Sequence, residues 1–226
     1  DGHALKNAGR YDDTAFFFFG DHGMYAGDYG LVDINQNTFE DSLSRVPFLC
    51  KPPKSAPVDA GVSDALIELT DLVATVEDLT GLESTHSHFG RSLLPAVADR
   101  SRAHRDAVFC EGGRLHGESH CMELQYKPGH TDPTDLYHPR LSLQAREGPE
   151  HTKAAMCRTK DFKYIRRFYE QDELYDLQQD PQELHNVVED PAYSEFIDWL
   201  KERMLTWYME TSDVVPIDTD LRWPPK

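Results

Sequence analysis

The sequence predicts an α/β protein in which a mixed sheet with helices on both faces is followed by a small α+β subdomain. The first observation is the continuous apolar run AFFFF at residues 15–19. Such a run is typical of a strand whose two faces are both covered, as in parallel or mixed sheets. The second observation is that, after residue 153, short alternating segments precede one long amphipathic segment. That order predicts a short antiparallel sheet and a terminal helix.

Apolar patterning and helix stop signals predict the elements of the first region. The opening residues DGHALKNAG read as the end of a helix that Gly9 stops. A second apolar run, residues 46–50, predicts another strand. Apolar residues at helical spacing predict a helix over 62–79 that ends at Gly81. The segment AVFCEGG predicts a further strand and turn, which continues the α/β layers to about residue 113.

The second half of the chain divides into an irregular loop and a compact end. Residues 114–153 are rich in His, Pro and Gly and lack periodicity, which predicts a long loop of the kind that often carries function. The segment AAMCRTKDFKYIRRF predicts a hairpin that turns at Lys160 and Asp161, and ELYDL predicts a third strand. The terminal helix begins at the Asp-Pro pair of DPAYSEFIDWLKERMLTWYMET. We therefore predict three regions, 1–113, 114–153 and 154–226.

Composition and charge exclude several classes of protein. Across 226 residues, 40 acidic and 23 basic side chains give a formal charge of −17 and a calculated pI of about 4.9. A surface this acidic repels phosphate backbones, so we expect no nucleic-acid partner, whereas clustered carboxylates favour a divalent cation. No apolar run approaches the roughly 20 residues that span a bilayer, so we expect a soluble protein. The four cysteines form no C-x-x-C pair, which argues against a zinc knuckle or a disulfide scaffold.

The stretch FFFFGDHGMYAGDYG, residues 16–30, carries the candidate chemistry. Asp21 and His22 stand just beyond the carboxyl end of the predicted strand, where open α/β sheets bind their ligands. Both are short side chains that can ligate a metal, and the surrounding glycines let the backbone turn tightly. By themselves these residues fit either a structural turn or part of a metal site.

Further motifs follow this stretch in a specific order. They begin with Asp21-His22-Gly23, Gly30-Leu31-Val32, Phe39-Glu40 and Arg45-Val46-Pro47, and continue with LTDLVATVEDLTGLE, FGRSLLP, MCRTKDFKYIRRF and ELYDLQQDPQELHNVVEDP. In this order, and over essentially the whole chain, they resemble the sulfatase family of the alkaline phosphatase superfamily. The resemblance implies the C-terminal part of an alkaline-phosphatase-like fold, with residues 1–113 forming the end of the α/β catalytic domain. Residues 114–153 then lie on the substrate side.

The resemblance also implies an activity and a cofactor. Members of the family hydrolyse sulfate esters with a formylglycine nucleophile, made from the Cys or Ser of a C/S-x-P-x-R motif, beside one divalent cation. Asp21 and His22 would be two ligands of that cation. Asp21 suits Ca²⁺, which prefers oxygen ligands. His22 suits Ca²⁺ less well and leaves Mn²⁺ or another divalent metal open, or a contact of His22 with the sulfate.

Two features of the sequence depart from the family pattern. The family supplies its nucleophile and two further aspartates from nearer the N-terminus, so the resemblance implies that this chain is a fragment that holds part of the site. The segment from Cys50 to Lys54 reads C-x-P-x-K, but its place after a strand and its final Lys make it a core cysteine and a loop rather than the nucleophile. The sulfate-binding Lys of the family is also missing, because Ile34 and Asn35 stand in its place.

Candidate substrate contacts come from the residues around the predicted loop. Arg114 and Lys153 are cations that could replace the missing Lys. His116, His120 and His151 could face the substrate, where a histidine could protonate the leaving alcohol. The substrate implied is a small-molecule or carbohydrate sulfate ester. Two other readings stay open: a phosphodiester or phosphonate monoester hydrolase of the same superfamily, and a non-catalytic truncated chain.

Overall fold

The computed structural model describes residues 2–34, 37–118, 132–138 and 152–215. The chain forms two compact units, each assembled from segments that are distant in the sequence. The first contains Asp1–Phe19, Phe48–Val108 and Glu202–Lys226, and the second contains Gly20–Pro47 and Phe109–Lys201. The second unit therefore joins the predicted metal pair to the C-terminal strands.

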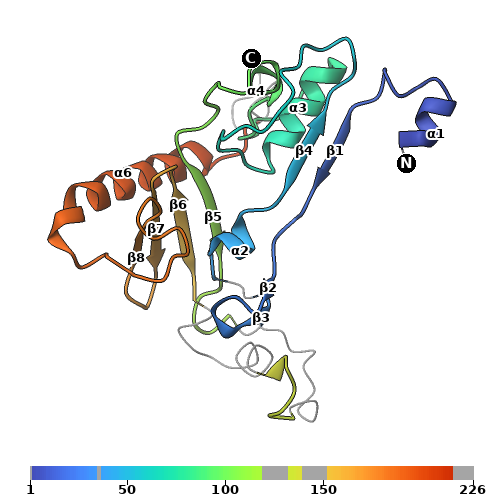
Figure 1. Cartoon of the computed structure of the whole chain (residues 1–226). Helices are drawn as coiled ribbons and strands as arrows, with labels where there is room; N and C mark the ends of the chain where they lie inside the picture. The colour runs from blue at the N-terminus through green and yellow to red at the C-terminus, as the bar shows by residue number, and fades with distance from the viewer. Residues whose placement is uncertain (1, 35–36, 119–131, 139–151, 216–226) are drawn as a thin grey trace, which may run out of the picture. The chain divides into compact units, whose positions relative to one another are not determined.

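A two-stranded ribbon lies in the first unit (Figure 1). Its strands are β1 (Phe16–Phe19) and β4 (Phe48–Lys51), which pair antiparallel and confirm the two strands predicted here. The expectation that β1 is covered on both faces is wrong for the described chain. Phe18 is 65% exposed and lies opposite Leu49, which is 63% exposed. Phe18 and Leu49 lie on the same face of the ribbon, and their exposure shows that this face is not covered among the described residues.

The helices of the first unit are α1 (Gly2–Asn7), α3 (Asp71–Thr80) and α4 (Leu94–Ala98). α1 ends before Gly9, whose φ of 66° confirms the predicted stop, and α3 ends at Gly81 with φ of 71°. The prediction of a helix from residue 62 is wrong, because α3 begins only at Asp71.

The buried side chain of Asp71 explains where α3 begins. One of its carboxylate oxygens accepts the backbone N–H of Glu68 at 2.9 Å, so that N–H is not available to a helix running through residue 68. The same carboxylate accepts the backbone N–H of Arg91 at 2.8 Å and Nε of Arg105 at 3.0 Å, and lies 3.0 Å from Nε2 of His104. Burial alone raises the pKa of Asp71, but the hydrogen bonds from His104 and Arg105 outweigh it and hold the pKa well below its usual range.

The second unit is built on a four-stranded sheet of order β5–β6–β7–β8 (Figure 1). The strands are β5 (Val108–Gly112), β6 (Ala154–Arg158), β7 (Phe162–Arg167) and β8 (Glu173–Asp176). The antiparallel pairing of β6, β7 and β8 confirms the predicted hairpin and third strand. The backbone N–H of Thr159 donates to the carbonyl of Phe162 at 2.8 Å and closes the hairpin turn. β5, predicted as part of the first region, pairs with β6 instead.

The core of the second unit lies against this sheet. Phe39, Ala154, Met156 and Ile165 form a buried apolar cluster. The 3₁₀ turn η4 (Pro191–Tyr193) leads into helix α6 (Ser194–Thr211), as the Asp-Pro start predicts. The ring of Phe196 on α6 lies 4.6 Å from that of Phe162, and Ile197 and Leu200 are buried. Near the sheet lie four short elements: β2 (Tyr25–Ala26), η1 (Asp28–Gly30), β3 (Val32–Asp33) and α2 (Asp41–Ser44).

Candidate metal and substrate site

The Asp21–His22 loop has local hydrogen bonds that orient its two candidate ligand side chains. The backbone N–H of His22 donates to Oδ1 of Asp21 at 3.0 Å. Nδ1 of His22 lies 2.8 Å from the carbonyl oxygen of Gly23. Since a carbonyl oxygen only accepts, Nδ1 carries a proton, and in the neutral ring Nε2 then presents a lone pair. Metal-bound histidines are held in this way, with the nitrogen opposite the metal donating to a carbonyl or carboxylate.

Gly23 places this loop directly on the backbone of α2. Its N–H donates to the carbonyl oxygen of Leu43 at 2.7 Å. A Cβ added at residue 23 would lie 1.9 Å from the carbonyl oxygen of Ser42, so a side chain cannot be accommodated there without moving one of the two backbones. The glycine of the Asp-His-Gly motif is therefore required by the contact between the loop and α2.

The donor atoms of the pair fit part of a divalent-metal site. The side chains of Asp21 and His22 are 87% and 50% exposed, and Nε2 of His22 lies 3.9 Å from Oδ2 of Asp21. One carboxylate and one neutral imidazole on adjacent residues are suitable ligands for Mn²⁺, and the carboxylate suits Ca²⁺. Within residues 2–34, 37–118, 132–138 and 152–215, no group of three or more His, Cys, Asp or Glu side chains converges as a metal site. The pair is thus suited to be part of a ligand set rather than all of it.

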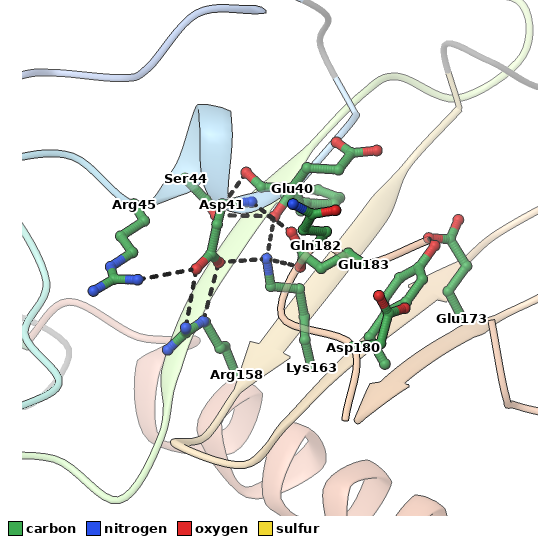
Figure 2. A network of polar contacts seen from close by, with 12 residues as sticks. Glu40, Asp41, Ser44, Arg45, Arg158, Lys163, Glu173, Asp180, Gln182 and Glu183 are labelled. Atoms are coloured by element: carbon green, nitrogen blue, oxygen red, sulfur yellow. Dashed lines mark hydrogen bonds and ion pairs between the residues drawn. The ribbon is translucent and has the colours of Figure 1, made fainter. Parts of the chain in front are cut away.

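A network of charged residues lies at the start of α2 (Figure 2). Nζ of Lys163, whose side chain is fully buried, donates to Oδ1 of Asp41 and to the carbonyl oxygen of Phe39, both at 2.8 Å. Lys163 also forms a close ion pair with Glu183. Arg158 donates to Asp41 from Nε at 3.2 Å and from its terminal nitrogen at 3.0 Å. We call Asp41, Arg158, Lys163 and Glu183 the α2 network.

The predicted substrate contacts meet, in part, at one end of the four-stranded sheet. Arg114 forms an isolated parallel bridge with Thr152, and its carbonyl oxygen accepts the backbone N–H of Lys153 at 3.0 Å. The structure therefore brings Arg114 and Lys153 together. The side chain of Arg114 is buried, whereas that of Lys153 is exposed. Of the two predicted cations, Lys153 is the one that can reach a ligand in solution.

Of the three histidines predicted to face the substrate, only His116 lies among the described residues. The exposed ring of His116 stacks on the ring of Tyr169 with a centroid distance of 4.2 Å and an interplanar angle of 13°. His120 and His151 lie outside the described residues. Ile34 is described, whereas Asn35, the other residue in place of the expected Lys, is not.

An exposed aromatic pair, Phe168 and Tyr169, lies near Lys153 and was not predicted from the sequence. These residues follow β7, and the backbone N–H of Phe168 donates to the carbonyl oxygen of Lys153 at 3.0 Å. Their rings are 4.7 Å apart and are 59% and 47% exposed. The available signal was two aromatic residues directly before the polar turn EQD, because turns of this kind rarely need large apolar side chains.

Cys50 occupies the position expected of a structural cysteine. It lies in β4 opposite Phe17 and is half-buried. Burial raises the pKa of its thiol, which disfavours the thiolate that a nucleophile requires. These surroundings agree with the interpretation of Cys50 as a structural cysteine rather than a nucleophile.

Comparisons with known proteins cover most of the chain. Residues 3–82 match the sulfatase family, and residues 115–210 match the family described as N-sulphoglucosamine sulphohydrolase, C-terminal. The chain belongs to the sulfatase family of the alkaline phosphatase superfamily. The two matches follow the order that the motifs predict, which confirms the family assignment made from the sequence.

Curated relatives of this sulfatase chain are longer proteins. It is 25% identical to human N-sulphoglucosamine sulphohydrolase, covering 92% of this chain and 44% of the relative. It is 23% identical to a multifunctional alkaline phosphatase superfamily protein from Trinickia caryophylli, covering 92% and 37%. The crystal structure of a phosphonate monoester hydrolase from Agrobacterium radiobacter aligns with a TM-score of 0.70 at 26% identity, covering 92% and 37%. The sulfatase chain therefore spans less than half the length of these relatives.

The alkaline-phosphatase-like fold expected of the sulfatase chain is confirmed by structural neighbours. A crystal structure from Bacteroides thetaiotaomicron, 21% identical, aligns over 98% of this chain and 42% of that chain with a TM-score of 0.69. Among the residues described, none of the helices has the length and apolar character to cross a bilayer.

Proposed function

We propose that the whole protein hydrolyses sulfate esters of carbohydrates and that this chain contributes part of its metal site and part of its substrate pocket. The observation that carries the proposal is the orientation of the Asp21–His22 pair, with Nδ1 of His22 directed at the Gly23 carbonyl and two donors exposed side by side. A sulfatase chain with this arrangement is suited to hold a divalent cation, Ca²⁺ or Mn²⁺.

The residues of this chain would act by holding and positioning. Bound at the pair, a divalent cation would supply Lewis-acid polarisation of the sulfate oxygens. Asp21 would contribute charge through its carboxylate, and the hydrogen bond to Gly23 would keep Nε2 of His22 as the donor. The nucleophile we propose is the formylglycine of the family, made in a segment other than these 226 residues, because no C/S-x-P-x-R motif occurs in them.

A carbohydrate substrate is supported by the chain's relatives and by its exposed residues. A relative named N-sulphoglucosamine sulphohydrolase acts on a sulfated sugar, as its name says. In this chain, Lys153 offers a cation for a sulfate group, while Tyr169 and the His116 stacked on it offer flat rings. We place these three side chains on the substrate side of the pocket, together with the buried Arg114.

The proposal is tested by Asp21→Ala in the whole protein. We expect the variant to lose its bound divalent metal and to lose hydrolysis of a sulfated glucosamine by at least about a hundredfold, because one charged ligand is missing. Metal content is measured by mass spectrometry of the purified protein and turnover by release of sulfate. The matched control is Asp28→Ala, which removes another exposed carboxylate seven residues later. Unchanged metal content in Asp21→Ala would remove this residue from the site.

A second candidate is phosphonate monoester hydrolysis in the same superfamily. It is favoured by the similarity to the phosphonate monoester hydrolase and by Ile34 and Asn35 in place of the sulfate-binding Lys. The two activities are separated by measuring kcat/KM for the phenyl monoester of a phosphonic acid and for phenyl sulfate and taking the ratio of the two values. Absence of both activities in the whole protein would leave the non-catalytic reading.

A further inference from the structure

The first observation is a lysine that is buried but has three partners. The side chain of Lys163 is 0% exposed, and its ammonium group contacts Asp41, Glu183 and the carbonyl oxygen of Phe39 (Figure 2). A buried ammonium is costly unless its hydrogen bonds are met with good geometry. Lys163 therefore favours one arrangement of its three partners over the alternatives.

The second observation is that the α2 network fixes where α2 begins. Asp41 is the first residue of α2, and its backbone N–H donates to Oε2 of Glu183 at 2.7 Å while its carboxylate binds Lys163 and Arg158. Burial on its own raises the pKa of Asp41, but Lys163 and then Arg158 outweigh burial and lower this pKa. The start of α2 is thus held, through both backbone and side chain, by residues from β6, β7 and the segment after β8.

The third observation connects α2 to the proposed metal ligands. The loop that carries Asp21 and His22 lies on α2 through Gly23, whose N–H donates to Leu43 at 2.7 Å. The ring of His22 is in turn oriented by the carbonyl oxygen of Gly23. A shift of α2 would move Gly23 and, with it, Nε2 of His22.

A separate contact joins the same loop region to the segment after β8. The hydroxyl of Tyr29 donates to the carbonyl oxygen of Gln182 at 2.9 Å, next to Glu183 of the α2 network. Tyr29 and Asp41 therefore both attach the region from His22 to the start of α2 to the segment after β8.

We propose that Lys163 is a positioning residue for the metal ligands, acting through Asp41, α2 and Gly23 on the Asp21–His22 loop. The inference rests on the proposed function, because it assigns Lys163 a role in the geometry of that metal site. Lys163 does not touch the metal pair in the structure, and its effect is transmitted by the backbone of α2. A change at Lys163 should then alter metal affinity as well as stability.

The inference is tested by comparing the Ca²⁺ affinity of the whole protein carrying Lys163→Met with that of the wild type. The metal-stripped protein is titrated with Ca²⁺, and in parallel with Mn²⁺, by calorimetry at a temperature where every variant is folded. We expect the dissociation constant to rise about tenfold, the lower end of the range for residues that orient metal ligands. The matched control is Leu200→Ala, which removes a fully buried side chain on α6, an element that contributes no residue to the α2 network. Equal affinities in Lys163→Met and wild type would overturn the inference.

A second variant covers the case in which Lys163→Met does not fold. Tyr29→Phe removes only the hydroxyl that donates to Gln182, from a residue that is 42% exposed. One hydrogen bond contributes about 1 kcal/mol, so we expect the metal dissociation constant to rise by up to about fivefold. Tyr29→Phe tests only the attachment at Gln182, so Glu183→Gln, which keeps the shape of Glu183 but removes its charge from Lys163, tests the α2 network itself. An unchanged constant in Glu183→Gln, with no folded Lys163→Met to measure, would overturn the inference.

The same titrations separate failure of this inference from failure of the proposed function. If the wild type binds neither metal, or if Asp21→Ala binds as the wild type does, the metal site itself is wrong. If Asp21→Ala loses binding but Lys163→Met matches Leu200→Ala, only the positioning role is wrong.

Discussion

The β1–β4 ribbon and the four-stranded sheet have opposite relations between residue type and burial. In the ribbon, Phe18 and Leu49 are apolar and face each other across the strands, yet both are largely exposed. In the sheet, Lys163 is charged and fully buried. The difference is one of surroundings, because the ribbon face with Phe18 and Leu49 is not covered among the described residues, whereas Lys163 is enclosed and has three polar partners.

The comparison teaches that burial depends on what surrounds a strand as much as on its side chains. An apolar strand is covered only if other elements pack on its faces. A lysine is tolerated inside when carboxylates and a carbonyl oxygen satisfy its ammonium group. The two regions therefore predict different responses to mutation.

The largest expected effect is in the α2 network. Asp41→Ala should lower the free energy of unfolding by about 3–5 kcal/mol, because it leaves buried Lys163 and its neighbour Arg158 without their shared carboxylate. Urea denaturation followed by circular dichroism measures the change. A loss below about 1 kcal/mol would mean that the network is not a source of stability and would break the comparison.

The next effect contrasts one leucine from each region. Leu174→Ala in β8 removes a fully buried side chain and should cost about 2–5 kcal/mol of unfolding free energy. Leu49→Ala in β4 removes a largely exposed side chain and should change stability by no more than about 0.5 kcal/mol. The same denaturation experiment compares the two variants. Similar losses at both positions would show that the ribbon is covered in solution.

The smallest expected effect is a pH dependence of the free energy of unfolding, which tests whether the Asp41 carboxylate is ionised in the folded protein. Its pKa is lowered in the folded state, so its stabilisation is complete above the unfolded pKa of about 3.9 and is lost as pH falls through the lower folded pKa. The difference in unfolding free energy between wild type and Asp41→Asn should therefore shrink as pH falls below about 4. Leu174→Ala serves as the control. It removes no ionisable group, so its loss of unfolding free energy should not change with the ionisation of Asp41. A constant difference for Asp41→Asn would contradict an ionised Asp41 in the network.

Local sequence patterns were sufficient to predict most of the longer elements and to recognise the family. The strands at β1 and β4, the hairpin of β6 and β7, the strand β8 and the start of α6 were predictable, because alternation, turn residues and capping residues act over a few positions. The order of the motifs identified a sulfatase chain. The helix predicted from residue 62 failed because Asp71 takes up the N–H of Glu68, a contact that depends on the distant partners Arg91 and Arg105.

For the candidate site, sequence alone selected Asp21, His22 and Gly23 as one motif. It did not reveal why the glycine is needed, since the contact of Gly23 with the backbone of α2 exists only in the folded chain. Nor did it mark Lys163, which in the sequence is one of several basic residues in an alternating strand.

By itself the sequence determined the type and order of the longer strands and of the terminal helix, because these depend on patterns among neighbouring residues. Only the tertiary structure decided that the segment of residues 20–47 folds with the C-terminal strands, and that Phe18 is exposed while Lys163 is buried. The physical reason is that burial and ion pairing are set by groups more than a hundred residues apart, such as Asp41 and Lys163, which no local pattern brings together.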